Sequence, residues 1–271
     1  MTRHVRNGCG PAALAVALSV AACGPRERDP ETPDARRERG LSMIQAMSDR
    51  LAASKSIAVE TSEEISRITR TGERRVDTFT RELKMRRPDR LYSRTRGARE
   101  LEIFYEGSRL TVISHPEKVY GELATPPTID ETVDVLSDRY DIALPIGDLL
   151  TDNPRHALIS SEMTGGWAGR ERVDGTMCAR LAWQHPRVDW TIWIPESGEP
   201  LPRRLHIIYK ARRGQPDAKV DFRKWDLHAN IPDETFARHV PADYDGIAVI
   251  QRASALAGSA EPPPAATSGK R

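Results

Sequence analysis

The residue types that most often carry enzyme chemistry are few in this 271-residue chain, and their spacing does not suit it. The seven histidines are scattered, and no H-x-x-x-H, C-x-x-C or H-E-x-x-H spacing indicates a zinc site. No G-x-S-x-G segment marks an activated serine, and no P-loop or G-x-G-x-x-G segment marks a nucleotide site. We therefore expect a protein that is not an enzyme, with no catalytic residue, no metal and no cofactor.

The residue with the clearest chemistry is Cys23, which lies on a border between two kinds of sequence. Before it, a short basic head with Arg3 and Arg6 leads into an apolar stretch from Ala12 to Ala22. This stretch is about half of the roughly 20 residues that cross a bilayer as a helix, so its length is typical of a secretory signal. Charged residues and prolines follow Cys23. A thiol at such a border is well placed to carry an anchor.

The segment Val20-Ala21-Ala22-Cys23 resembles the lipobox of bacterial lipoproteins. The resemblance implies a signal peptide over residues 1–22, cleavage before Cys23 and a diacylglyceryl group on the Cys23 sulfur. Several buried acyl chains, at about 0.8 kcal/mol per CH₂, hold a protein on a membrane without a spanning helix. Gly24 stands where an inner-membrane retention signal usually has Asp, which favours the periplasmic side of the outer membrane. The alternative is an ordinary cleaved signal, or an uncleaved anchor, with a chance cysteine.

The cysteines and the net charge argue against a disulfide framework and against a nucleic-acid partner. Cys9 lies in the signal, so Cys178 is the thiol left in the exported chain, and we expect a buried strand residue without a disulfide. Lys+Arg number 41 against 39 Asp+Glu, and the signal contains Arg3 and Arg6 but no acidic residue. The exported chain is therefore near neutrality, which argues against a nucleic-acid partner, because such binding needs a basic surface.

Segments of low apolar content flank the part of the chain that can fold. Residues 24–40 contain three prolines and no apolar residue beyond Ala35, so we expect the lipidated cysteine to begin a disordered tether over residues 23–40. Residues 247–271 end in a stretch of small residues and prolines and are expected to be a disordered tail. The folded domain is therefore predicted over residues 41–246.

Apolar periodicity predicts a domain of many strands and two or three helices. Residues 41–51 carry a helical stripe, Thr128 and Glu131 form a T-x-x-E capping box for a second helix, and residues 145–150 add a helical turn. Alternating residues predict strands within 56–62, 77–85, 90–96, 101–107, 109–115, 178–184, 188–194, 203–211 and 218–227. We therefore predict an α+β fold, a curved antiparallel sheet of about nine to eleven strands with the helices over one face.

Four strings, "MRRPDRLYSR", "IFYEGSRLTV", "PPTIDETVDVLSDRYDIALPIGDLL" and "VDWTIWIPESGEPLPRRLHIIYK", resemble a family of predicted periplasmic proteins. This family of unknown function belongs to the LolA/LolB-like lipoprotein-carrier superfamily, and the resemblance covers most of residues 41–246. It implies an incomplete antiparallel β-barrel with helices as its lid, which holds acyl chains in the best-understood members. It implies no reaction, because a fold alone does not define one.

The inward apolar faces of the predicted strands supply the candidate binding site. The expected ligand-contacting side chains are Trp190, Ile192, Leu205, Ile207, Val220 and Phe222. The alternative is that these side chains and the helices fill the space between them. If lipoprotein insertion were the function, an exposed apolar loop would be needed, and the segment around Trp167 is the candidate; the alternative, which we favour, is a turn in which Trp167 is packed.

Two functions follow from the anchor and the resemblance. The first is a membrane-anchored periplasmic binder or carrier of a lipid, a lipoprotein or another apolar ligand. The alternative is a protein-interaction module with a periplasmic protein partner, like the envelope-stress sensor RseB, which has the same superfamily fold.

Overall fold

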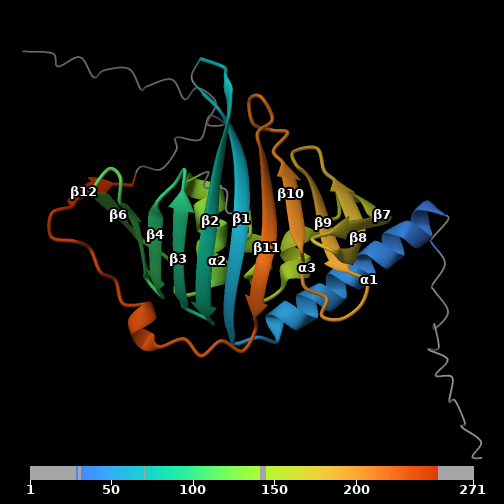
Figure 1. Ribbon diagram of the computed structural model, residues 1–271, viewed down its shortest axis with the longest axis horizontal. Coiled ribbons are helices and arrows are strands. Elements are labelled where there is room, and N and C mark those ends of the chain that lie inside the picture. Colours follow the sequence, from blue (N-terminus) through green and yellow to red (C-terminus); the bar gives the residue numbers. More distant parts are fainter. Residues whose placement is uncertain (1–28, 30–31, 70, 141–144, 250–271) are drawn as a thin grey trace, which may run out of the picture.

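The computed structural model describes residue 29 and residues 32–69, 71–140 and 145–249. In this part of the chain, twelve strands form one sheet in the order β12-β6-β5-β4-β3-β2-β1-β11-β10-β9-β8-β7, and helices lie against one of its faces (Figure 1). Every neighbouring pair is antiparallel except β12 with β6, which is parallel. The predicted α+β class is confirmed. The signal peptide, Cys23 and most of the tail lie outside the described residues.

The elements follow one another as two meanders that meet at the β1–β11 pair. The strands are β1 (Ser56–Ile68), β2 (Arg74–Arg86), β3 (Arg90–Gly97), β4 (Leu101–Glu106), β5 (Arg109–Ser114), β6 (Val119–Ala124), β7 (Thr164–Val173), β8 (Thr176–Gln184), β9 (Asp189–Pro195), β10 (Arg204–Ile208), β11 (Asp217–Asp226) and β12 (Asp245–Ala248). The helices are α1 (Pro33–Ala52), α2 (Ile129–Tyr140) and α3 (Pro154–Leu158), with the 3₁₀ turns η1 (Gly147–Leu149) and η2 (Asp233–Thr235).

Helix α1 begins at Pro33, so the prediction of a disordered tether was wrong for residues 33–40. Thr32 caps the helix by accepting a hydrogen bond from the Ala35 backbone N–H, and proline at the first position suits the helical φ. The charged first turns have partners in the residues directly before β7 and directly after β9. Arg37 donates to the Met163 carbonyl at 2.8 Å, and Arg39 lies 3.5 Å from Glu196.

The predicted amphipathic patterns of the helices are confirmed. Ile44, Met47 and Leu51 of α1 are fully buried against the sheet. At α2, the Thr128 hydroxyl accepts from the Glu131 N–H at 3.3 Å, as a capping box requires. Among the described residues, no helix combines the length and the apolar character that a membrane span requires.

Strand β7 was not predicted, and the segment around Trp167 is neither the candidate exposed loop nor a turn, although its tryptophan is packed as the second alternative expects. Trp167 lies within β7, is 7% exposed and has the Arg39 guanidinium 5.2 Å above its ring. Glycines let this strand touch α1 directly, since a Cβ built on Gly40 would lie 2.7 Å from the Gly166 Cα. Strands β6 and β12 were also missed, and β12 extends past the predicted domain end at residue 246.

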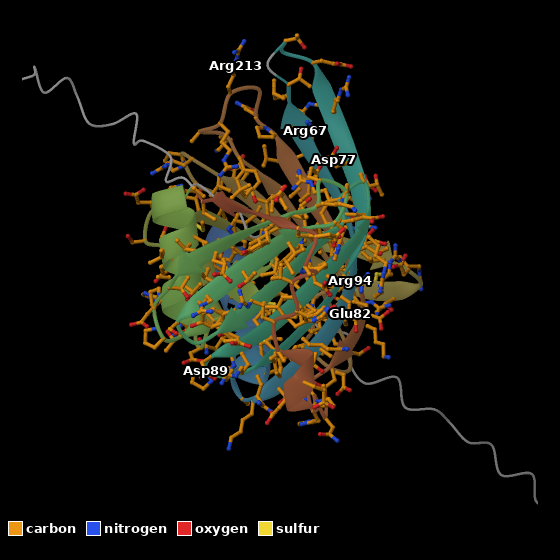
Figure 2. All side chains as sticks on the ribbon, turned by 90° about the vertical axis from the view of Figure 1, so that its left-hand side faces the viewer. Arg67, Asp77, Glu82, Asp89, Arg94 and Arg213 are labelled. Atoms are coloured by element: carbon orange, nitrogen blue, oxygen red, sulfur yellow. The ribbon has the colours of Figure 1, made fainter. Side chains whose placement is uncertain are left out.

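The long hairpin of β1 and β2 projects beyond the rest of the sheet (Figure 2). Arg67 and Asp77 form an ion pair near its tip, with 3.1 Å between Nε and Oδ2. Gly72 makes the connecting turn with a φ of 88°, a left-handed conformation that glycine adopts without strain.

Candidate functional site

The register of the strands places the six predicted ligand-contacting residues on one face of the sheet. Leu205 of β10 lies opposite Ile192 of β9 and Val220 of β11, while Ile207 lies opposite Trp190. Side chains two residues apart on a strand share a face, so Phe222 joins this group through Val220. All six pack with the buried residues of α1, so their face is the one that the helices cover.

Burial divides these residues into a sealed group and an accessible one. Trp190 is 5% exposed, and Ile192, Leu205, Val220 and Phe222 are at most 1% exposed. These five are core side chains that a ligand would reach only if the helices moved. Ile207 is only half-buried.

The other half of the same face is less sealed, and sequence reasoning missed it. Half-buried apolar side chains pack against the core from β3 to β6 and from α2, namely Leu91, Ile103, Val112, Leu123 and Val133. Ile103 lies opposite Val112 in the β4–β5 ladder. The alternation in "LEIFYE" and "RLTVIS" was the signal for these positions, but it does not show which half of a sheet the helices cover closely.

A buried ion pair lies on β1 and β2, between the two halves of the helix-covered face. Glu63 of β1 is 1% exposed and accepts two hydrogen bonds from Arg81 of β2, from Nε at 2.6 Å and from Nη2 at 3.2 Å. Thr61 donates to the same carboxylate at 2.8 Å, and Arg81 donates to the Ser93 hydroxyl at 3.0 Å. Val59 and Thr61 are two residues apart on β1 and therefore share a face, and Arg81 lies directly opposite Thr61. This polar group therefore lies on the same face of the sheet as Val59.

Burial shifts the pKa of two further groups, Tyr209 and Asp148, and Tyr209 also interacts with Glu63. Burial raises the pKa of Tyr209 to about 12, and the negative charges of Asp148 and Glu63 contribute to the shift. The Asp148 side chain is exposed, yet the protein around it removes part of its hydration and raises its pKa to about 6, with help from the charge of Asp134. Tyr209 is therefore a neutral phenol, and Asp148 changes charge at about pH 6.

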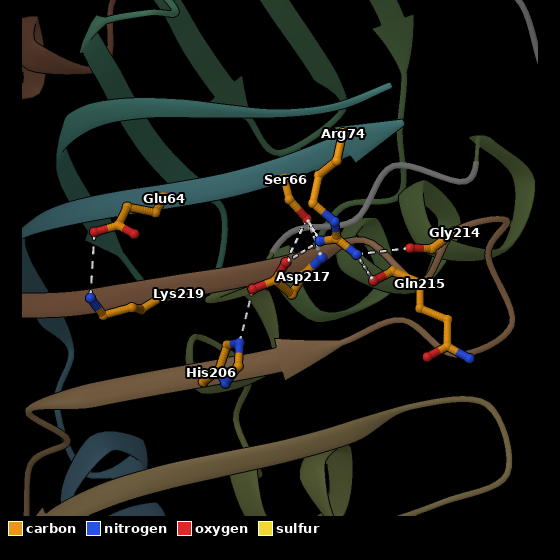
Figure 3. A network of polar contacts seen from close by, with 8 residues as sticks. All are labelled: Glu64, Ser66, Arg74, His206, Gly214, Gln215, Asp217 and Lys219. Atoms are coloured by element: carbon orange, nitrogen blue, oxygen red, sulfur yellow. Dashed lines mark hydrogen bonds and ion pairs between the residues drawn. The ribbon is translucent and has the colours of Figure 1, made fainter. Parts of the chain in front are cut away.

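The opposite face of the sheet carries a polar network that includes a serine, an aspartate and a histidine (Figure 3). Asp217 accepts from the Ser66 hydroxyl at 2.5 Å and from Arg74 at 2.8 Å, and it lies 3.0 Å from His206 Nε2. Burial alone would raise the pKa of Asp217, but the hydrogen bonds from Ser66 and His206 and the nearby charges lower it. Arg74 also donates to two backbone carbonyls of the β10–β11 loop.

This network does not have the order that serine catalysis needs. In a catalytic triad the histidine lies between the serine and the aspartate, so that it can take the hydroxyl proton. Here Asp217 lies between Ser66 and His206, and the serine proton is already donated to the carboxylate. The open recess beside the network, about 620 Å³, is lined by residues that brace the β1–β2 hairpin. We therefore interpret the network as a structural brace.

The other groups that the sequence singled out do not form a site. Cys178 is fully buried and packs with Val173 and Trp193. Burial raises the pKa of its thiol, which keeps it unreactive. The described residues contain no cluster of three or more side chains that could hold a metal ion.

Fold and site together define a class of protein, one with an open, mostly antiparallel sheet and helices over its apolar face. The family model described as "Predicted periplasmic protein (DUF2092)" matches residues 41–250. The chain therefore belongs to this family of periplasmic proteins, and the resemblance found in the sequence is confirmed. No protein of curated function matches the chain.

Three solved structures are similar in shape. An uncharacterized conserved protein from Thermus thermophilus has a TM-score of 0.45 and 9% identity, over 75% of this chain and 98% of that chain. The lipoprotein LppX of Mycobacterium tuberculosis has a TM-score of 0.45 and 15% identity, over 71% and 97%. A LolA superfamily protein of Nitrosomonas europaea has a TM-score of 0.38 and 12% identity, over 74% and 98%. At these identities the likeness concerns shape alone.

Proposed function

We propose that this protein is a membrane-anchored periplasmic lipoprotein that binds or carries a lipid or another apolar ligand and performs no catalysis. The observation that carries the proposal is the unsealed half of the helix-covered face, where apolar side chains such as Ile103 and Val112 are only half-buried. Half-buried apolar groups beneath helices gain free energy when a hydrocarbon covers them, at roughly 25 cal/mol per Å².

The ligand in this proposal lies between the sheet and α2. It contacts Ile103 and Val112 directly, while Ile207 and the five sealed residues of the predicted site lie on the other half of the same face, on β9 to β11. The Glu63–Arg81 pair would then face the middle of the ligand or its polar end. Because each charge already has its partner, we expect the pair to tolerate an uncharged polar group and to attract no free ion.

The anchor in this proposal is the acylated Cys23, and the address is the periplasmic side of the outer membrane. The lipobox-like segment before Cys23 and the periplasmic family support it. Mass spectrometry of the full chain from its own membranes should find acyl groups on this residue. Replacing it, as Cys23→Ala, should move the protein from the membrane fraction to the soluble periplasmic fraction.

Native mass spectrometry tests the ligand. Protein lacking residues 1–23, exported to the periplasm by a cleavable signal and purified without detergent, should carry acyl species that disappear after denaturation and refolding. The refolded protein should then bind a fluorescent fatty acid. A domain that is empty after purification and excludes the probe would contradict the proposal. If cross-linking in cells then recovered one dominant periplasmic protein, the protein-interaction alternative would be favoured.

A further inference from the structure

The N-terminal segment is fixed to one edge strand of the sheet before α1 begins. Asp29 forms an ion pair with Arg170 of β7. Arg170 also donates to Glu196 at 2.6 Å, and Arg39 of α1 lies 3.5 Å from the same carboxylate. Helix α1 then lies along β7, where Gly40 and Gly166 bring the two backbones into contact. The chain therefore enters the domain at β7.

The chain between this point and the proposed anchor is short. Asp29 is the sixth residue after Cys23, and six residues reach at most about 22 Å when fully extended. The sheet is much wider than this reach. Twelve strands spaced about 4.8 Å apart extend over about 50 Å along the sheet, with β7 at one edge and β12 at the other. The first turn of α1 and β12 lie at opposite ends of the long axis of the domain (Figure 1).

From this geometry we propose which surface meets the lipid bilayer. The edge formed by β7, β8 and the first turns of α1 faces the membrane, and the β6–β12 edge points into the periplasm. The short tether holds this orientation. The inference rests on the proposed lipidation of Cys23, but not on the presence of a ligand.

Depth-dependent quenching tests the orientation on the lipidated full chain. In a Cys178→Ala background, Arg172→Cys places a fluorophore on β7 and Ile247→Cys places one on β12, and both positions are exposed. Each protein is inserted into vesicles of phosphatidylethanolamine and phosphatidylglycerol that carry a spin label on the headgroup. We expect quenching at position 172 to be at least twice that at position 247. Equal quenching, or stronger quenching at position 247, would overturn the proposal.

A variant with a longer tether tests whether the tether, and not an affinity of the β7 edge for lipid, causes the orientation. Twenty glycine and serine residues inserted between Arg28 and Asp29 leave the domain unchanged but remove the limit on reach. The difference between the two positions should then vanish, and its persistence would overturn the role of the tether. Mass spectrometry of the same samples separates the two proposals. An unmodified Cys23 would refute the anchor and with it the orientation, whereas an acylated Cys23 with reversed quenching would refute the orientation alone.

Discussion

Arg81 and Glu63 form a two-point ion pair in the middle of a mostly apolar sheet face, with N–O distances of 2.6 and 3.2 Å. Their side chains are 12% and 1% exposed, so both charges have lost most of their hydration. Such a pair contributes little net stability, because its attraction only offsets the cost of desolvation, but it makes each partner depend on the other. The pair is also the point where the sealed and the accessible halves of this face meet.

Removing one partner of this pair should be strongly destabilising. Arg81→Met leaves the Glu63 carboxylate buried and unpaired, and we expect it to lower the free energy of unfolding by about 3–5 kcal/mol. The double variant Glu63→Leu/Arg81→Met should recover most of that loss. Urea unfolding followed by tryptophan fluorescence measures both. The control is Arg67→Met, which breaks an exposed ion pair with Asp77 and should cost no more than about 1 kcal/mol. A double variant no more stable than Arg81→Met would contradict the interpretation.

Asp148 should make the domain more stable in mild acid. Its pKa is raised to about 6, so the folded state holds the proton more tightly than the unfolded state does. The contribution of this group to stability therefore rises as pH falls from about 7 toward 4, and its charged form destabilises the fold above pH 6. Asp148→Asn should raise stability at pH 7.5 by no more than about 1 kcal/mol, because solvent screens this exposed side chain, and should change little at pH 4.5. Thermal unfolding of both proteins at the two pH values checks this, and a loss of stability at pH 7.5 would refute it.

The contact between α1 and β7 should not tolerate a methyl group. In Gly40→Ala the new Cβ would meet the Gly166 backbone at 2.7 Å, and we expect a loss of about 1–3 kcal/mol as helix and strand separate. Ser42→Ala, at an exposed position of the same helix, should stay within about 0.5 kcal/mol of the parent protein. Denaturant midpoints give both values. Equal midpoints for Gly40→Ala and Ser42→Ala would show that the helix is free to shift.

A charge on the accessible apolar surface should abolish ligand binding. Ile103→Arg places a guanidinium among the half-buried side chains, so the proposed acyl ligand should no longer co-purify or should do so at least tenfold less. Val76→Arg is the matched control, since Val76 is 57% exposed on the β1–β2 hairpin, away from the helices. Native mass spectrometry compares the two. Equal ligand content in both variants would show that the ligand does not bind at Ile103.

Local patterns predicted much of this fold. The stripe of α1, the capping box of α2 and the alternation of the central strands each depend on residues a few positions apart. The N-terminal half of α1 was missed because the run from Asp34 to Arg39 has no apolar stripe, although Thr32 and Pro33 are a recognisable helix start. Strand β7 was missed because its glycines weaken the strand pattern, and one of them, Gly166, leaves the room for α1 to lie directly on the strand.

The candidate site was less predictable than the fold. Alternation correctly placed Trp190, Ile192 and their neighbours on one face, but it does not give their burial. Which half of the face is sealed depends on where α1 and α2 lie, and that is set by long-range packing. The Glu63–Arg81 pair depends on the register between β1 and β2, which fixes Thr61 opposite Arg81. A slip of one residue would move Arg81 to the opposite face, and residue types alone do not exclude such a slip.

The strand order also has a kinetic consequence. Within β1–β6 and within β7–β11, each strand pairs with its neighbour along the chain, so each half can assemble through short loops. The β1–β11 pair joins the two halves into one sheet, and the hydrogen-bonded Ser66 and Asp217 of these strands are 151 residues apart in the chain. Closing so long a loop is entropically costly and slows folding. During folding, the two half-sheets should therefore form before β1 pairs with β11. The backbone amides along β1 and β11 should gain protection from hydrogen exchange last.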